Sequence, residues 1–216
     1  MPSVRNIDSP LAGRALALDD TPNELLSSAA WDIQGTLLKP GSRSTVTRVD
    51  LAGKAYVFKQ YKALSLNRRL RYAFTRSRAR QSWENGQAMA DFGLPIVRPL
   101  AFFEESNLGI PGRSLLIMPF QEGIPLHEYE ALEKVAPALR EIFRKMADHK
   151  ITHGDLKATN ILIDRNGSPH FIDIDASRIH SNDSSYRAAR QKDEERFLRN
   201  WEDHPEGQRV FREIFN

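Results

Sequence analysis

A short segment of the sequence holds an acid, a base and an amide at close spacing, and these residue types suit the chemistry of phosphate groups. Asp155 is followed by Lys157 and Asn160, and a further acid, Asp173, ends an apolar segment shortly afterwards. Phosphoryl transfer needs a carboxylate that orients and deprotonates a hydroxyl, a cation that offsets charge on the transferred oxygens, and oxygen ligands for Mg²⁺. The segment contains all of these residue types.

A predicted β-hairpin explains how the second acid returns to the first. Segments 161–163 and 170–172 are largely apolar, and the Asn-Gly pair at 166–167 is typical of a tight hairpin turn. We expect two short antiparallel strands that bring Asp173 back to Asn160. A single Asp in this segment would more often stabilise a turn, so the prediction depends on all of these residues occurring together.

The His-Gly-Asp-x-Lys-x-x-Asn pattern at 153–160 resembles the catalytic loop of protein kinases, with Gly154 where those enzymes usually carry Arg. The resemblance implies that Asp155 is the catalytic base and that Lys157 steadies the γ-phosphate of ATP. It also implies that Asn160 is a Mg²⁺ ligand.

The Phe-Ile-Asp-Ile-Asp pattern at 171–175 resembles the strand that ends in the metal-binding Asp-Phe-Gly triplet of kinases. The resemblance implies that Asp173 binds Mg²⁺, with Asp175 as the alternative ligand. Asp175 stands where the triplet has Gly, and neither an Ala-Pro-Glu segment nor a long activation loop follows. We therefore expect the acceptor to be a small molecule or a sugar rather than a protein.

An upstream lysine and glutamate match the nucleotide-anchoring pair of kinases in type and order. Lys59 ends an apolar strand pattern, and Glu84 lies in a helical segment before the turn at 93–95. Kinases pair a strand Lys with a helix Glu, and the Lys contacts the α- and β-phosphates. The resemblance implies the same ion pair here.

The segment 115–123 resembles the strand and hinge that hold adenine. Met118, Pro119 and Gln121 are the expected contacts: the Pro119 carbonyl would accept a hydrogen bond from the adenine amine, and the Gln121 amide would donate one. Gly41 stands in the loop that would cover the phosphates, where backbone amides could form a nest, although the G-x-G-x-x-G pattern is absent.

Segments 77–85, 93–100 and 193–201 resemble the bacterial lipopolysaccharide kinases, a group that includes Kdo kinases and core heptose kinases. The resemblance runs from about Val46 to Trp201. It implies transfer of the γ-phosphate of ATP to a sugar hydroxyl, of heptose or Kdo, in a lipid-linked core oligosaccharide. It also implies a cytoplasmic location, at the inner face of the inner membrane.

The order of the expected elements predicts an α+β, two-lobed, protein-kinase-like fold, because strand patterns and one long helix precede a mainly helical half. We expect an N-terminal arm over residues 1–30, an N-lobe with an antiparallel sheet over 31–120, and a reduced helical C-lobe with the catalytic loop over 121–216. Besides the hairpin above, the expected strands are 44–50, 55–59, 96–104 and 114–120, and the expected helices are 64–92, 127–149 and much of 184–215.

Composition excludes several classes of site. The chain of 216 residues has no cysteine, so disulfides, thiolate metal sites and thiol nucleophiles are excluded. Residues 1–30 show no signal-peptide pattern, and no run of 18 apolar residues predicts a membrane span.

A basic segment between Leu51 and Trp83 contains nine Lys and Arg residues and no acid. Its arginines between Arg68 and Arg80 lie beside an apolar stripe. They form either a solvated helix face or a surface for anionic lipid headgroups or acidic core sugars.

Other functions remain open at this level. A kinase-like binding module without activity, and a small protein kinase of the RIO type, both fit the catalytic segment. The Asp173-x-Asp175 pair also fits a glycosyltransferase, although that function would not explain Lys59, Glu84 or Asp155. Zinc catalysis lacks an HExxH motif, and nucleic-acid binding lacks an aromatic platform or a known module.

Overall fold

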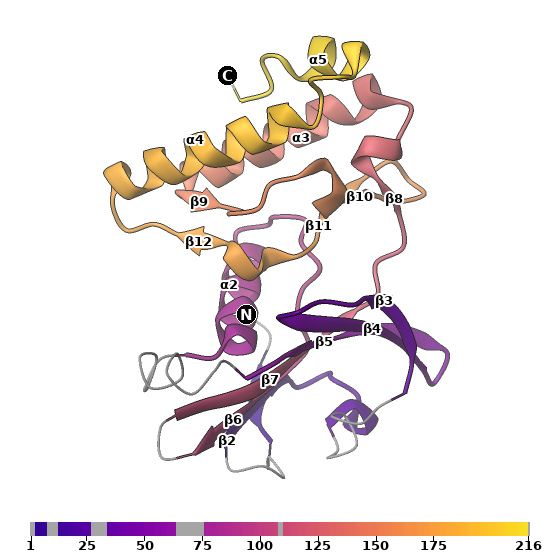
Figure 1. Ribbon diagram of the computed structural model, residues 1–216, viewed down its shortest axis with the longest axis vertical. Coiled ribbons are helices and arrows are strands. Elements are labelled where there is room, and N and C mark those ends of the chain that lie inside the picture. Colours follow the sequence, from indigo (N-terminus) through magenta and orange to yellow (C-terminus); the bar gives the residue numbers. More distant parts are fainter. Residues whose placement is uncertain (1–2, 8–12, 27–33, 64–75, 108–109, 216) are drawn as a thin grey trace. The chain divides into compact units, whose positions relative to one another are not determined.

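The computed structural model describes residues 3–7, 13–26, 34–63, 76–107 and 110–215 (Figure 1). The chain divides into two compact units. The first unit contains residues 1–87 and 98–120, and the second unit contains residues 88–97 and 121–216. Each unit is described by itself.

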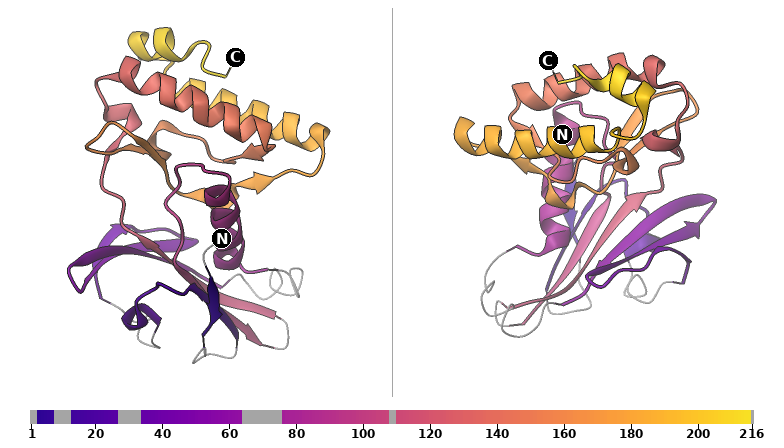
Figure 2. Two further views of the ribbon diagram at one scale, coloured as in Figure 1. Left: turned by 180° about the vertical axis from the view of Figure 1, so that it is seen from behind. Right: turned by 45° about the horizontal axis from the view of Figure 1, so that its top comes forward.

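The first unit is built on a seven-stranded antiparallel sheet with the strand order β1-β2-β6-β7-β5-β4-β3. Figure 2 shows this sheet from two further sides. The expected hairpin of 44–50 and 55–59 is confirmed as β4 and β5. The strands are β1 (Val4–Asn6), β2 (Gly13–Leu18), β3 (Thr36–Lys39), β4 (Ser44–Leu51), β5 (Lys54–Tyr61), β6 (Ala101–Asn107) and β7 (Ile110–Pro119).

Residues 1–30 differ from the separate arm that we expected, because they supply β1 and β2 to this sheet. Strand β2 pairs with β6, and Ala15 and Ala17 are buried in the core of the unit. The Leu18 amide also donates to the Leu100 carbonyl over 2.9 Å. The small side chains of Ala15 and Ala17 allow this strand to pack closely in the core.

Helix α2 (Arg78–Asp91) packs against one face of the sheet. Trp83 of α2 is buried with Phe102 and Leu116, which pair across β6 and β7. The next pair, Phe103 and Leu115, belongs to the core on the opposite face, as the alternation of strand side chains requires. Of the long helix expected over 64–92, residues 64–75 lie outside the described part, and the described helix begins at Arg78.

The second unit consists mainly of helices, with three short β-pairings. Helices α3 and α4 run side by side in both Figures 1 and 2, and a core of apolar residues from α3, α4, α5 and the strands joins them. The elements are β8 (Ile124–Pro125), η3 (Leu126–Glu128), α3 (Leu132–Asp148), β9 (Ile151–Thr152), η4 (Ala158–Asn160), β10 (Ile161–Ile163), β11 (Pro169–Phe171), η5 (Ile174–Ala176), β12 (Arg178–Ile179), α4 (Asp183–Arg199) and α5 (Pro205–Phe211).

The sheet and helices confirm the expected α+β class, and several element boundaries differ from the sequence prediction. Residues 96–100 are not a strand, because Pro95 precedes the segment and Pro99 lies within it; Ile96 makes only an isolated bridge to Phe171. Helix α3 begins at Leu132 rather than at residue 127, after a short 3-10 helix. In the described part of the chain, no helix has the length and apolarity needed to span a membrane.

Candidate active site

The Asp155 carboxylate lies among three groups of the second unit. Lys157 Nζ donates to Asp155 Oδ2 over 2.9 Å, and Arg196 Nε lies 3.5 Å from Asp155 Oδ1. Asn160 Nδ2 donates to the Asp155 carbonyl over 2.9 Å and lies 3.4 Å from Oδ2. About a third of the Asp155 side chain is exposed. The structure therefore brings Asp155, Lys157 and Asn160 together, with one carboxylate partly open to solvent.

The backbone before Asp155 is held by a buried acid on α4. Asp193 Oδ2 accepts hydrogen bonds from the His153 amide over 2.7 Å and from the Gly154 amide over 3.0 Å. Because Asp193 is buried, these charged hydrogen bonds are short and not exposed to competition from water. The start of the catalytic loop is thus fixed by a helix that follows it in sequence.

His153 is fully buried and links the loop to the end of β11. Its Nε2 lies 3.0 Å from the Ile172 carbonyl, and since a carbonyl only accepts, Nε2 carries the proton. Burial lowers the pKa of His153 below its usual range, against the opposing effect of the Asp193 charge. His153 therefore links the loop to the end of β11 through this hydrogen bond.

Gly154 explains why this loop departs from the kinase pattern, in which Arg is usual. Its φ is +78°, and a Cβ at this position would collide with the Ala176 carbonyl. A side chain would therefore meet both backbone strain and the backbone of η5. Only Gly fits this conformation at this distance.

Asn160 and Asp173 lie at the open end of the predicted hairpin, which the structure confirms. Strand β10 pairs antiparallel with β11, and the Ile172 amide donates to the Asn160 carbonyl over 3.0 Å. Asp173 follows directly, with a left-handed φ of 58° that is uncommon outside Gly, Asn and Asp. The hairpin thus returns the second acid to the residue that precedes β10.

The donor set at this hairpin end fits Mg²⁺. The Asn160 amide nitrogen is directed at Asp155, so its carbonyl oxygen is the atom that can serve as a ligand. A carboxylate and an amide oxygen suit a hard cation that keeps several waters. Among the described residues no group of three or more His, Cys, Asp or Glu is arranged to hold a metal ion, and Mg²⁺ binding by Asn160 and Asp173 stays a prediction.

Lys59 lies in the first unit on the sheet face that α2 covers. It pairs with Leu116 across β5 and β7, so the two side chains share a face, and Leu116 packs with Trp83 of α2. Lys59 is 7% exposed, which is unusual for lysine. Lys59 is therefore not a surface residue, and its role as the phosphate anchor stays a prediction.

Glu84 is held by two arginines of the same unit. Arg76 Nη1 donates to its carboxylate over 2.5 Å, and Arg80 Nε donates over 2.9 Å. The ion pair that we expect between Lys59 and Glu84 stays a prediction.

Two of the expected adenine contacts lie on β7, the strand that pairs with β5, which carries Lys59. Met118 and Pro119 end β7, where Pro119 pairs with Tyr56 and Met118 packs against the α2 core. Gln121 begins the second unit. Gly41 lies in the loop between β3 and β4, and its carbonyl accepts from Lys62 Nζ over 3.1 Å. Their binding of a nucleotide stays a prediction.

The basic segment is described only in part. Arg68, Arg69 and Arg71 lie outside the described residues. Arg80 and Arg76 are engaged by Glu84, and the Arg78 guanidinium stacks 4.6 Å from the Tyr61 ring. Some of the positive charge of this segment is therefore compensated within the first unit.

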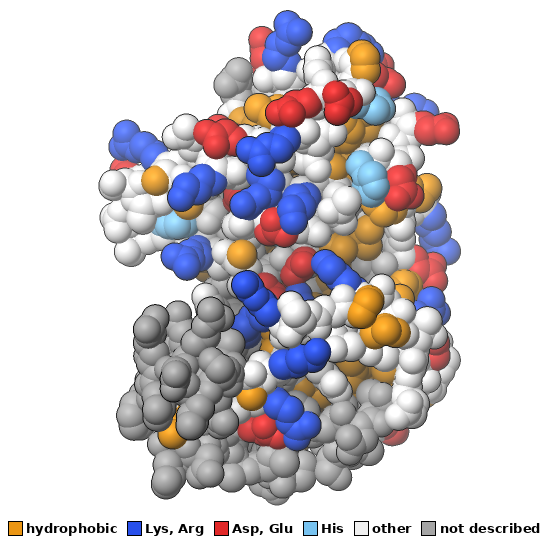
Figure 3. All heavy atoms as spheres, viewed as in Figure 1, with side chains coloured by type: hydrophobic (Ala, Val, Ile, Leu, Met, Phe, Trp, Pro, Cys, Tyr) orange, Lys and Arg blue, Asp and Glu red, His pale blue; other side chains and the backbone are white. Residues whose placement is uncertain are grey.

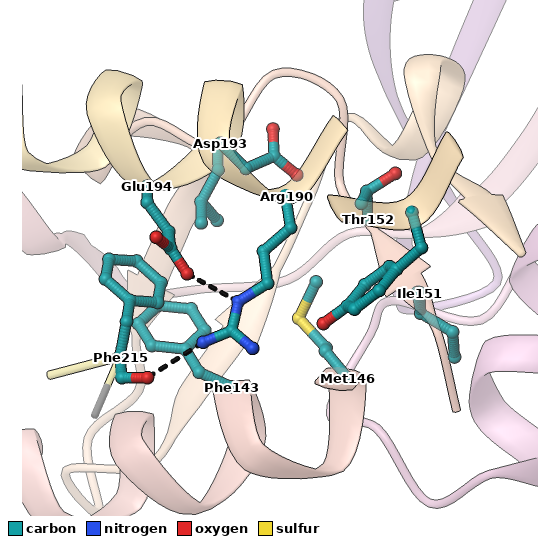
Figure 4. Close-up of a pocket in the computed structure, with 10 residues that line it drawn as sticks. Phe143, Met146, Ile151, Thr152, Arg190, Asp193, Glu194 and Phe215 are labelled. Atoms are coloured by element: carbon teal, nitrogen blue, oxygen red, sulfur yellow. Dashed lines mark hydrogen bonds and ion pairs between the residues drawn. The ribbon is translucent and has the colours of Figure 1, made fainter. Parts of the chain in front are cut away.

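A small cavity lies between α3 and α4 of the second unit (Figure 4). Its volume is about 20 Å³, enough for a single water, so it is not a nucleotide site. Arg190 crosses it and donates to Glu194 over 2.5 Å and to the Phe215 carbonyl over 2.8 Å. These contacts tie α4, which carries Asp193, to the end of the chain.

Sequence reasoning missed the roles of Asp193 and Arg196. The segment 193–201 contributed only to the family resemblance, and its contacts to the loop were not expected. Both side chains lie on one side of α4, because residues three apart in a helix are neighbours. The signal was the pair of opposite charges at this spacing in an otherwise helical tail.

Comparison with known proteins shows the fold and the family of the chain. No curated protein matches the chain by sequence. A solved structure described as WaaP in complex with acyl carrier protein is similar, with a TM-score of 0.56 and 14% identity over 86% of each chain. This similarity confirms the kinase-like fold. The model of the lipopolysaccharide kinase (Kdo/WaaP) family matches residues 37–212. The chain therefore belongs to the lipopolysaccharide kinase family.

Proposed function

We propose that this protein transfers the γ-phosphate of ATP, in the presence of Mg²⁺, to a hydroxyl of heptose or Kdo in the lipopolysaccharide core. The observation that carries the proposal is the arrangement around Asp155 in a chain of this kinase family. A carboxylate, a lysine and an asparagine are held together beside a hairpin that ends in Asp173.

Asp155 acts on the acceptor. Its partly exposed carboxylate accepts the hydrogen bond of the sugar hydroxyl and orients the oxygen toward the γ-phosphorus. As the new O–P bond forms, the bond from the γ-phosphorus to the bridging oxygen breaks and ADP keeps the electron pair. The hydroxyl proton passes to Asp155.

Lys157, Asn160 and Asp173 act on the phosphate side. The Lys157 ammonium lies 2.9 Å from Asp155, close enough to offset negative charge on a phosphoryl group that approaches the same carboxylate. Asn160 and Asp173 would hold Mg²⁺ through their side-chain oxygens. When bound, the cation neutralises charge on the phosphate oxygens.

The first unit binds the nucleotide in this proposal. Buried Lys59 contacts the α- and β-phosphates, Glu84 orients it, and the amides beside Gly41 cover the phosphates. Met118, Pro119 and Gln121 contact adenine through apolar atoms and backbone groups. Use of ATP follows from membership in a kinase family.

The acceptor is a lipid-linked core oligosaccharide, and the protein works in the cytoplasm at the inner face of the inner membrane. Family membership supports this acceptor. The arginines between Arg68 and Arg80 would contact anionic headgroups or core sugars there. Charge reversal at Arg69 and Arg71 should then weaken binding to vesicles that contain anionic lipid, and the remaining binding should be sensitive to salt.

Two measurements test the proposal. Mass spectrometry of lipopolysaccharide from cells that lack this chain should show the loss of one phosphate from the core. Purified protein should transfer labelled γ-phosphate to that lipopolysaccharide, and Asp155→Asn should abolish transfer while ATP still binds. Asp148→Asn, which changes an exposed acid of α3, is the matched control. ATP binding without transfer by the unaltered protein would instead identify a binding module.

A further inference from the structure

Arg196 reaches the catalytic loop from α4 and contacts it at two points. Nη1 donates to the Gly154 carbonyl over 2.5 Å, and Nε lies 3.5 Å from Asp155 Oδ1. The two contacts use different edges of one planar guanidinium group, which fixes the direction of both. One side chain therefore touches the carboxylate of Asp155 and the peptide group directly before it.

The two oxygens of Asp155 have different cationic neighbours. Arg196 lies at Oδ1, whereas Lys157 lies at Oδ2 over 2.9 Å. Lys157 is on a flexible stem with almost half of its side chain exposed, and the proposed reaction requires it to engage phosphate. When Lys157 does so, Arg196 at Oδ1 and the Asn160 amide, 3.4 Å from Oδ2, are the groups of the described residues that still hold the plane of the carboxylate.

The Gly154 peptide groups are clamped from two sides by α4. Asp193 Oδ2 accepts from the Gly154 amide, while Arg196 Nη1 donates to the Gly154 carbonyl. Arg196 Nη1 also lies 3.8 Å from Asp193 Oδ1, a buried oxygen that accepts no hydrogen bond from any described residue. The charges of Asp193 and Arg196 thus compensate each other, while Asp193 binds the amide of Gly154 and Arg196 binds its carbonyl.

We propose that Arg196 is a positioning residue for Asp155, which keeps the carboxylate in the orientation that accepts the acceptor hydroxyl. The inference rests on the proposed role of Asp155 as the base. Arg196 itself transfers no proton and contacts no adenine, so its loss should lower kcat and leave the KM for ATP unchanged. A displacement of the base by about 1 Å can lower the rate by about 100-fold.

The test compares Arg196→Ala, Arg196→Lys and Arg199→Ala with the unaltered protein. Arg199 is exposed on the same helix, where Lys and Arg side chains gather (Figure 3), and has no side-chain partner in the described ranges. The probes are labelled ATP and lipopolysaccharide from cells that lack the chain. We expect about a 100-fold lower kcat for Arg196→Ala, an intermediate kcat for Arg196→Lys, and no change for Arg199→Ala.

Added ethylguanidinium provides a readout that a purely structural role would not give. It should restore part of the kcat of Arg196→Ala by occupying the vacated contacts, and it should not affect Arg199→Ala. The inference is wrong if Arg196→Ala keeps its kcat, or if its lost kcat accompanies a lower melting temperature and ethylguanidinium restores nothing. Asp155→Asn separates the two proposals: if that variant remains active, the proposed function fails as well.

Discussion

Replacing Asp193 with Asn tests whether the buried acid holds the catalytic loop. Asp193 Oδ2 accepts two backbone hydrogen bonds, of 2.7 and 3.0 Å, and the side chain is almost fully buried. A hydrogen bond to a charged group contributes about 1 kcal/mol more than one to a neutral group, so two such bonds weaken by about 2 kcal/mol in total. The new amide group would also face Arg196 Nη1 with a less favourable charge.

The expected result is a loss of stability together with a loss of activity. For a protein of this size, about 2 kcal/mol corresponds to a melting temperature lower by roughly 4 to 8 °C. Circular dichroism on heating measures the melting temperature, and phosphate transfer measures the activity. Asp203→Asn, at an exposed position after α4, is the control and should change neither. If Asp193→Asn has the melting temperature and the activity of the unaltered protein, the reasoning is refuted.

Three further predictions concern the same region. Gly154→Ala should destabilise the protein and abolish transfer, because the residue has a φ of +78° and its new Cβ would collide with the Ala176 carbonyl. Gly167→Ala has a similar φ of +79° but more space, so it should lower the free energy of unfolding, measured by thermal unfolding, by only about 1–2 kcal/mol. Burial lowers the pKa of His153, so as pH falls this residue binds a proton in the unfolded chain before it does so in the folded protein. The free energy of unfolding, measured by urea titration, should therefore fall as pH drops below about 6.5. His153→Gln should flatten this dependence on pH, and the control His127→Gln, at an exposed position, should not. Asp173→Ala should remove Mg²⁺-dependent nucleotide binding in calorimetry, and if binding persists, Asp175 is the ligand.

The hairpin and its flanking residues were predictable because local signals determine them. The Asn-Gly pair at 166–167 set the turn, and two apolar segments of matched length set the register that returns Asp173 to Asn160. The contacts of Lys157 and Asn160 with Asp155 also follow from closeness in sequence. Information within about twenty residues was sufficient for this half of the site.

The contributions of distant segments were not predictable from local patterns. Strand β2 joins the sheet beside β6, far away in sequence, and its alternating small residues gave only a weak strand signal. Asp193 and Arg196 read as ordinary charges of a polar helix until the fold placed them beside the loop. The strained backbone of Gly154 likewise became understandable only through the approach of Ala176.

Asp193 and Arg196 hold the loop at Gly154 only if both side chains lie on the same side of α4. Each residue of an α-helix turns the side-chain direction by about 100°, so a one-residue insertion between these positions would swing one of the two away from residue 154. Both residues must therefore keep their spacing of three positions on α4 for both contacts to form. The pair should therefore be inherited together, and a substitution at one position should be tolerated only when the other changes to match.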